Sequence, residues 1–513
     1  MSMLWSGWGD PERATPLAPE VAGLLRDVLG VRAAATPPVA LADITLREPR
    51  LSAAALAALE AVAELRTDAE SRIRHTRGKS TPDLLRIRAG EVSAAPDAVV
   101  LPDGQEGVRA VLRVCAEHRI AVVPFGGGTS VVGGLAPSAD GFVALDLQRM
   151  DRLLAVDPVS RTATLQPGLR GPRAEAMLNA EGYTLGHFPQ SYEWASIGGF
   201  AAARSSGQAS AGYGRFDEMV VGLTAVTPSG DLDLGRAPRS AAGPDLRQLL
   251  LGSEGAFGVI TSVTVRIRPL PADKSYEGWR FDSFAAGSAA LRRLAQDGPL
   301  PTVLRLSDET ETLIGLARPA EIGGAPAAGC LAVVGFEGTA AEVAARSAGA
   351  RSVLEECGGS CLGNGPGESW AHGRFAAPYL RDALLDVGAF AETLETAGFW
   401  SGLPGLYEAV RSALAATLTS PLVMCHISHV YPAGASLYFT VVTADAGEWP
   451  SAKQAAGEAI IAAGGTISHH HGIGTDHRAW YAEEIGPVGV GVLRAVKKEL
   501  DPQNILNPGI LIP

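Results

Sequence analysis

The sequence is poor in cysteine and offers no disulfide framework. Five cysteines are spread thinly through 513 residues, an odd number that fits a reducing compartment better than a secreted domain. The only close pair, in CGGSC at 357–361, has the spacing of neither a common zinc site nor a common redox site. We therefore expect ordinary thiols and a cytoplasmic protein.

The chain also lacks basic blocks and long apolar runs. Its formal net charge is −12 and no block of like charge occurs, which argues against a nucleic-acid surface as the main partner. The first residues, MSMLWSGWGDPERATPL, do not combine a basic start with an apolar stretch. Charges or glycines interrupt the apolar segments elsewhere within about a dozen residues. We expect no nucleic-acid partner, no signal peptide and no membrane span.

The local patterns change along the chain, whose length allows two or three domains. Apolar residues recur at helical spacing in LSAAALAALEAVAEL, so the N-terminal part is expected to be helical. From about residue 95, short β-rich runs such as DAVVLP and GFVALDL alternate with helical stretches. Several neighbouring strands mixed with helices favour an α+β fold over a repeating βαβ sheet.

A boundary is expected at RIRPLPADKSYEGW (266–279), where prolines and a polar cluster end the strand-rich block. Strand patterns (CLAVVGFEG, ASLYFTVVTA) and long helical patterns then alternate up to about residue 445. The predicted division is a helical N-terminal segment (1–90), a cofactor-binding domain (91–271), a cap or substrate domain (272–450) and a C-terminal segment (451–513).

A glycine-rich stretch follows an apolar strand pattern at VPFGGGTSVVGG (123–134). Consecutive glycines let backbone N–H groups turn toward one point, as a diphosphate requires. The stretch has no P-loop lysine, and Val131 stands where a dinucleotide fingerprint has its third glycine. Two more glycine- and hydroxyl-rich stretches, at 186–230 and 250–269, suggest an extended ligand held at several points, such as a flavin dinucleotide.

Several motifs carry a family resemblance. PFGGGTSVVGG, QSYEWASIGGFAAARSSG and GSEGAFGVIT, in this order, resemble the flavin-binding domain of the vanillyl-alcohol oxidase/para-cresol methylhydroxylase (PCMH) superfamily. YPAGASLYF and SHHHGIGTDHRAW are similar to the alkyldihydroxyacetonephosphate (alkylglycerone-phosphate) synthase family, especially its bacterial members. The resemblance implies a PCMH-type FAD-binding domain, a cap domain of antiparallel sheet plus helices, and a C-terminal segment that closes on the FAD domain.

The resemblance also implies where FAD lies. The cofactor-binding residues it implies fall in four groups: Pro124, Phe125, Gly126, Gly127, Gly128, Thr129 and Ser130; Gln190, Ser191, Tyr192, Glu193, Trp194, Ala195 and Ser196; Ala203, Arg204, Ser205 and Ser206; and Glu254, Gly255, Ala256, Phe257, Gly258, Val259 and Ile260. Many superfamily members attach flavin to a histidine or cysteine. Neither residue occurs in 124–134 or in SAGYGRFDE, so we expect noncovalent FAD.

For the activity, the resemblance implies a redox-neutral exchange of the acyl group of acyl-dihydroxyacetone phosphate for a long-chain alcohol, with the dihydroxyacetone phosphate unit carried on flavin N5. Tyr438 would transfer a proton at the substrate C1, and its ordinary pKa near 10 would require neighbours that stabilise the phenolate. Arg381 would pair with the substrate phosphate, with Arg305 as a second candidate. His469, His470 and His471 would set the protonation of Tyr438 and hold the substrate.

The partners expected from the resemblance are small-molecule lipid substrates and a second copy of the chain in a homodimer. Contact with a membrane surface is expected where lipid substrates are collected. At two positions that could affect the substrate pocket, the sequence differs from the eukaryotic members of the family. Gln190 stands where eukaryotic members have an acidic residue, and His429 stands where they have an uncharged polar one.

The sequence leaves three other functions open. The same scaffold also serves FAD-linked oxidases and dehydrogenases of 2-hydroxy acids such as D-lactate. A metalloprotein could use His469–His471 with His426 and His429, although adjacent histidines on a strand point to opposite faces. We therefore expect no metal. A flavin-free binding protein is the third alternative.

Overall fold

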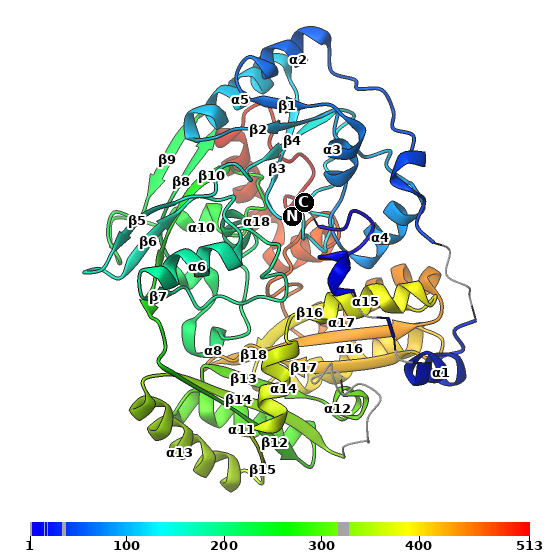
Figure 1. Ribbon diagram of the computed structural model, residues 1–513, viewed down its shortest axis with the longest axis vertical. Helices are drawn as coiled ribbons and strands as arrows, with labels where there is room; N and C mark the ends of the chain where they lie inside the picture. Colours follow the sequence, from blue (N-terminus) through cyan, green and yellow to red (C-terminus); the bar gives the residue numbers. More distant parts are fainter. Residues whose placement is uncertain (1–2, 15, 18, 33–36, 316–327) are drawn as a thin grey trace.

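The computed structural model describes residues 3–14, 16–17, 19–32, 37–315 and 328–513. A four-stranded and a five-stranded sheet lie in the upper half of the molecule in Figure 1, and a seven-stranded sheet lies in the lower half. Helices cover these sheets instead of alternating regularly with parallel strands. The predicted α+β class is confirmed.

The first 90 residues contain short helices and one strand. In chain order these are η1 (Pro11–Arg13), α1 (Pro19–Val28), η2 (Leu41–Asp43), α2 (Ala53–Glu60), β1 (Glu64–Arg66), α3 (Ala69–Arg74) and α4 (Thr81–Arg88). The expected helix over LSAAALAALEAVAEL ends at Glu60, because the residues that follow pair with another strand. β1 runs antiparallel to β2 (Ala98–Leu101), so tertiary pairing overrides local helix propensity there.

The first sheet has the strand order β1-β2-β4-β3, with β3 at Ala121–Phe125 and β4 at Phe142–Asp146. β2, β4 and β3 run parallel, and α5 (Gln105–His118) connects β2 to β3. The buried residues of α5 are Val108, Val111, Leu112 and Cys115, a helical spacing that turns one face to the sheet. β3 leads directly into the glycine loop.

The second sheet is antiparallel, in the order β5-β6-β10-β8-β9. Its elements and their neighbours are β5 (Leu153–Asp157), β6 (Thr162–Leu165), α6 (Gly171–Ala180), β7 (Tyr183–Thr184), α7 (Ile197–Ala202), α8 (Ser210–Tyr213), α9 (Phe216–Met219), β8 (Val220–Thr227), β9 (Gly230–Leu234), α10 (Arg247–Leu250), β10 (Val259–Arg266) and β11 (Arg268–Pro269). A core around Phe200 and Phe216 joins α7 and α9 to this sheet.

The third sheet is antiparallel throughout, in the order β15-β12-β14-β13-β17-β18-β16. Its elements are β12 (Asp273–Phe281), α11 (Phe284–Asp297), β13 (Val303–Ser307), α12 (Glu309–Ile314), β14 (Cys330–Gly338), α13 (Ala340–Glu356), β15 (Ser360–Gly363), α14 (Gly365–Gly373), α15 (Ala377–Asp386), β16 (Phe390–Phe399), α16 (Leu403–Thr417), β17 (Leu422–Ile427) and β18 (Gly434–Thr443). α11, α13 and α16 share one large core with one face of this sheet.

Successive side chains of β18 point alternately into the large core and to the other face of the sheet. Leu437, Phe439 and Val441 enter the large core, whereas Tyr438 and the next alternate residues line a cavity. β17 alternates in the same way, because successive side chains of a strand point to opposite faces. At β17 and β18 the sheet thus has helices on one side and a cavity on the other.

The chain ends with η4 (Ala446–Glu448), α17 (Trp449–Ala462) and α18 (Arg478–Leu500), which is interrupted at Gly486. After α18 the chain returns to the first sheet, where the Val122 N–H donates to Ile505 O at 2.8 Å. Asn507 Nδ2 donates to the carbonyls of Gly134 and Glu254. Within the described ranges, no helix has the length and apolar character needed to cross a bilayer.

Candidate active site

A cavity of about 450 Å³ brings together segments from all parts of the chain. Its lining includes the glycine loop, the 189–208 stretch, the start of β10, and the faces of β17 and β18 that point away from the large core. Helices α1 and α15 contribute apolar side chains to the same cavity. Distant sequence motifs therefore share one cavity.

The glycine loop is fitted tightly against the 190–196 stretch. A Cβ at Gly126 would lie 2.3 Å from Ser196 Oγ, and a Cβ at Gly127 would lie 2.1 Å from the Trp194 carbonyl oxygen. Side chains are therefore excluded, and the backbone itself forms the cavity wall. Within the described chain, the N–H groups of residues 126–130 donate to no protein acceptor. Such a row of free N–H groups fits the phosphates of a dinucleotide.

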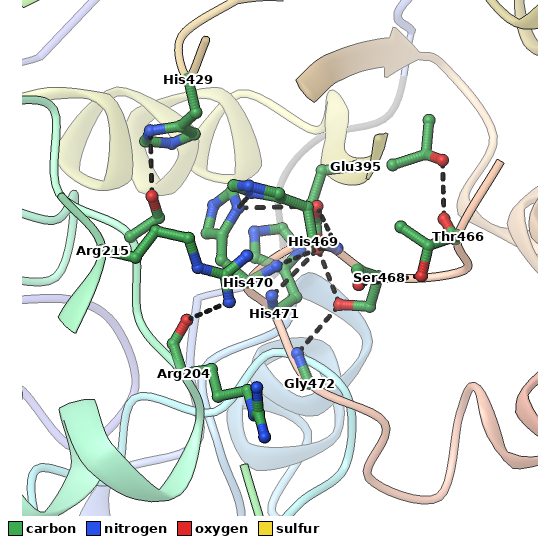
Figure 2. Close-up of polar contacts among 12 residues, drawn as sticks. Arg204, Arg215, Glu395, His429, Thr466, Ser468, His469, His470, His471 and Gly472 are labelled. Carbon is green, nitrogen blue, oxygen red and sulfur yellow. Dashed lines mark hydrogen bonds and ion pairs between the residues drawn. The ribbon is translucent and has the colours of Figure 1, made fainter. Parts of the chain in front are cut away.

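The histidine run is held by one buried carboxylate, Glu395 of β16. Glu395 accepts the backbone N–H groups of His469, His470 and His471 at 2.8–3.1 Å, and the Ser468 hydroxyl at 2.8 Å. Figure 2 shows these donors converging on Glu395. Burial alone would raise the pKa of this carboxyl, but the adjacent imidazoles and N–H groups lower it well below its usual range.

The three histidines lie in an irregular turn and not in a strand. His470 and His471 line the cavity, whereas His469 does not and instead meets the Tyr431 hydroxyl at 2.7 Å. Burial lowers the pKa of all three imidazoles, that of His471 to about 3. They are therefore neutral near pH 7, able to exchange hydrogen bonds but not to serve as cations.

Tyr438 lies at the centre of these aromatic rings. Its ring stacks on His426 at 4.9 Å between centroids and on His470 at 6.0 Å, and His471 meets it edge-on at 5.5 Å. Burial raises the pKa of Tyr438 to about 12. Thr393 and Arg305 favour the phenolate, but burial outweighs them, so in the protein alone Tyr438 is a phenol at neutral pH. Its catalytic role stays a prediction.

Several cationic side chains reach the cavity. Arg381 donates to the Lys79 carbonyl at 2.5 Å and to Asp382, so much of its charge is neutralised. Arg305 pairs with the buried Glu311. Arg374 differs, because its Nε and Nη1 are buried without a partner among the described residues. The Arg374 guanidinium lies over the rings of Phe188 and Phe375 at 4.8 and 5.0 Å, and its two free N–H groups suit an anionic or carbonyl ligand.

Lys79, another side chain of the cavity lining, is tied to the N-terminus. Its Nζ donates to the carbonyls of Leu4 and Trp5, and burial lowers its pKa to about 7. Trp8 also lines the cavity, and its N–H donates to Asp382 at 2.5 Å. The N-terminal residues therefore complete the wall of the site.

His429, His469 and His470 each have a ring nitrogen within 4.8 Å of the others. Such a cluster contains enough imidazoles for a metal ion, but Arg215 adds a positive charge that lowers the pKa of all three histidines further. A cation would be repelled by the same charge. The absence of a metal stays a prediction.

Similarity to known proteins agrees with this geometry. The pattern described as FAD binding domain matches residues 96–233, and that of FAD linked oxidases, C-terminal domain, matches residues 270–511. An alkyldihydroxyacetonephosphate synthase of Trypanosoma brucei brucei is 34% identical over 482 residues, which cover 88% of this chain and 78% of the relative. The chain belongs to the alkyldihydroxyacetonephosphate synthase family.

Solved structures agree with the family. A structure of an alkyldihydroxyacetonephosphate synthase has a TM-score of 0.84 and 29% identity, covering 99% of this chain and 98% of that one. Para-cresol methylhydroxylase shares the fold, with a TM-score of 0.69 at 18% identity over 90% of this chain and 98% of its own. The predicted family, the PCMH-type FAD-binding fold and the FAD cofactor are confirmed.

Most residues that the synthase resemblance assigns to FAD line the cavity. They are Pro124 to Ser130, Gln190, Ser191, Ala195, Ser196, Ala203, Ser205, Ser206, Glu254, Gly255, Gly258 and Ile260. Glu254 accepts the N–H groups of Ile473 and Gly474 at 2.6 and 2.8 Å, just after the histidine run. It thus joins the cofactor region to the histidines, and burial raises its pKa to about 7.

Seven of the residues expected at the cofactor do not line the cavity: Tyr192, Glu193, Trp194, Arg204, Ala256, Phe257 and Val259. Each has a packing role instead. Tyr192 stacks on Phe375 and Glu193 pairs with Arg13. The Arg204 guanidinium donates to backbone carbonyls of Leu251 and Gln248. The other four are buried in hydrophobic clusters.

Other cavity residues were missed by reading the sequence. Lys79, Gln208, Arg374 and Glu392 line the cavity although the sequence indicated no role for them. A single charged or amide side chain gives no local signal of function. His426 also lines the cavity, and the sequence suggested it only as a metal ligand.

Proposed function

We propose that this chain is an FAD-dependent transferase that exchanges the acyl group of acyl-dihydroxyacetone phosphate for a long-chain alcohol, forming an ether lipid precursor. The observation that carries the proposal is the joining of a polar catalytic end and an apolar end in one cavity. Tyr438 and Arg381 line the former, whereas Val21, Leu25 and Met424 line the latter. An alkyldihydroxyacetonephosphate synthase with 34% identity supports the same assignment.

The apolar end suits an aliphatic chain. Its lining consists of Val21, Leu25, Ile314, Leu380, Leu384, Leu422, Met424 and Val442, contributed by α1, α12, α15, β17 and β18. Each methylene transferred from water to such a surface gains about 0.8 kcal/mol. Binding energy from a long chain can thus hold the reacting head group at the polar end.

FAD, when bound, would supply an electron-accepting ring for the exchange at C1. The backbone N–H groups of the glycine loop suit its diphosphate, and Ser205 and Ser206 offer hydroxyls to the same cavity. The tight fit of Gly126 and Gly127 leaves the loop backbone itself to face the cofactor. Noncovalent attachment is part of the proposal, since neither histidine nor cysteine occurs in the glycine stretch 124–134 or in SAGYGRFDE.

The substrate phosphate is expected to lie among Arg381, Lys79 and Arg374. Arg374 is the most open of the three, because two of its nitrogens have no described partner. A phosphate dianion in this region would also favour the protonated form of Lys79. The guanidinium of Arg374 can bind two phosphate oxygens at once, which fixes the orientation of the phosphate.

Tyr438 is proposed to move the proton at the substrate C1. In the protein alone its pKa is about 12 because of burial, so the bound reactants must favour the phenolate. His470 and His471 are neutral and stand next to the ring. Neutral imidazoles can accept or donate a hydrogen bond to the phenol oxygen without adding charge.

Assembly and location belong to the same proposal. We propose a homodimer in the cytoplasm that touches membrane surfaces to collect lipid substrates. Light scattering of the purified protein tests the dimer, and cosedimentation with phospholipid vesicles tests surface binding.

The decisive experiment uses purified protein reconstituted with FAD. Acyl-dihydroxyacetone phosphate and labelled hexadecanol should yield the alkyl product and free fatty acid, without net flavin reduction. Bleaching of the flavin by 2-hydroxy acids such as D-lactate, with no ether product, would instead identify a dehydrogenase. A preparation that binds no flavin after reconstitution would contradict both activities.

A further inference from the structure

A buried carboxylate–imidazole pair lies next to Tyr438. Glu311 of α12 is fully buried, and it meets His426 Nδ1 at 2.8 Å and the Ser307 hydroxyl at 2.9 Å. Arg305 pairs with the same carboxylate. Burial would raise the pKa of Glu311, but His426 and Arg305 lower it to about 2, so the carboxylate is ionised.

The ionised Glu311 fixes the tautomer of His426. A carboxylate can only accept a hydrogen bond, so the proton of the neutral imidazole must lie on Nδ1. The lone pair then lies on Nε2, since the one side-chain hydrogen bond found for His426 in the described chain is that of Nδ1 with Glu311. Because His426 lines the cavity, this arrangement leaves a proton acceptor there.

The fold places this acceptor at the reacting end of the cavity. His426 in β17 and Tyr438 in β18 are directly paired across the two antiparallel strands. Their rings stack with a centroid distance of 4.9 Å and an interplanar angle of 18°. A substrate atom that contacts the Tyr438 ring edge is therefore within reach of His426.

No other histidine of the cavity has an equivalent carboxylate partner in the described chain. His470 Nδ1 lies 3.5 Å from Glu395, and the same nitrogen is 3.0 Å from His469 Nδ1. Both oxygens of Glu395 are already used by backbone N–H groups. His426 is thus the imidazole whose orientation a carboxylate defines.

The proposed exchange needs such a group. A neutral alcohol enters and a carboxylate leaves, so one proton is released in each turnover. The alcohol O–H bond breaks as its oxygen forms the new bond to C1, and the bond from C1 to the acyl oxygen breaks with its electron pair leaving on the carboxylate. Tyr438 is assigned to the proton on C1 and does not account for the alcohol proton.

We propose that His426 Nε2 accepts the hydroxyl proton of the entering alcohol and that Glu311 is the positioning residue that holds the imidazole for this step. The inference rests on the proposed function. The imidazolium formed on His426 is paired with Glu311, and its proton passes to solvent once the product leaves.

Two exchange reactions of the same enzyme test this assignment. A labelled fatty acid can replace the acyl group as a carboxylate, which brings no proton into the site, whereas an alcohol must lose one. H426Q keeps a polar side chain but cannot accept a proton near neutral pH. We expect H426Q to slow alcohol incorporation roughly 100-fold or more and to leave acylate exchange within about threefold of the wild type. E311Q should lower the alcohol rate selectively, by a smaller factor.

The outcomes distinguish a failure of the His426 assignment from a failure of the proposed exchange activity. Equal loss of both exchanges in H426Q with normal flavin content would overturn the assignment, because a merely structural role affects both. If the wild type carries out neither exchange, the proposed function itself fails. Should H426Q bind no flavin, H426A with added imidazole decides: restored alcohol incorporation supports the assignment, and none refutes it.

Discussion

The replacement of Glu395 by glutamine tests how the histidine run is held. Glu395 Oε1 accepts four donors: the Ser468 hydroxyl and the N–H groups of His469, His470 and His471. Oε2 accepts the His469 N–H at 2.8 Å. Glutamine has the same shape, but in its better orientation the NH₂ group replaces Oε2 and faces the His469 N–H.

The expected cost follows from these contacts. Hydrogen bonds to a charged acceptor contribute about 1.5–3 kcal/mol each and neutral ones about 0.5–1.5 kcal/mol, so loss of the charge weakens all of them. The buried His469 N–H keeps its bond to Oε1 but loses the one to Oε2 and faces a donor there, which adds about 1 kcal/mol. Since the loop can relax, we expect a net loss of about 3 kcal/mol, localised at residues 468–472.

Hydrogen exchange of the loop amides measures this quantity directly. A loss of about 3 kcal/mol corresponds to roughly 100-fold faster opening of the 468–472 segment. The rate of alcohol exchange should fall with it, because His470 and His471 lose their positions beside Tyr438. Glu408→Gln, an exposed substitution on α16, is the matched control and should stay within about 0.5 kcal/mol of the wild type.

Unchanged amide protection in Glu395→Gln would refute the reasoning, even if activity were lost. Such a result would mean that the loop is held by its own turns and by Glu254, and that the charge of Glu395 serves another purpose. Faster exchange across the whole chain would point to global destabilisation instead of local release.

Four further outcomes are expected. Tyr438→Phe should reduce alcohol exchange at least about 100-fold with normal flavin absorbance; unchanged turnover contradicts its role. Gly127→Ala should abolish the flavin colour, because its Cβ would lie 2.1 Å from the Trp194 carbonyl oxygen, whereas Gly405→Ala, with open space around it, should keep the colour. Acid precipitation should release all flavin into the supernatant; yellow pellets would indicate covalent attachment. The folded pKa of Glu395 is depressed, so its stabilisation is present above the ordinary value of about 4.3 and is lost as pH falls below it; loop exchange should accelerate in that window in the wild type but not in Glu395→Gln.

The sequence was informative where a structural or functional feature is formed by consecutive residues. Residues 126–128 have no room for side chains. A run of glycines is therefore required there, and this run in the sequence indicates the loop's function. Alternation in ASLYFTVVTA correctly predicted β18, because a strand with one face in the core repeats every second residue.

Sequence reasoning failed where tertiary contacts outweigh local preference. The helical spacing up to residue 65 gave no indication that β1 would pair with β2. The side chains of Tyr192 and Trp194, in a cofactor motif, pack against other parts of the protein, and their contact with FAD stays a prediction. A motif identifies a stretch of chain, but side-chain direction depends on what surrounds it.

The sequence by itself determined the family, the FAD cofactor and the run of three histidines. Only the tertiary structure decided that His470 and His471 face the cavity while His469 does not. It also decided which carboxylates serve the site, since Glu395 lies more than seventy residues from the histidines and Glu311 lies 115 residues from His426. A buried charge requires partners at hydrogen-bonding distance, and folding alone determines which partners those are.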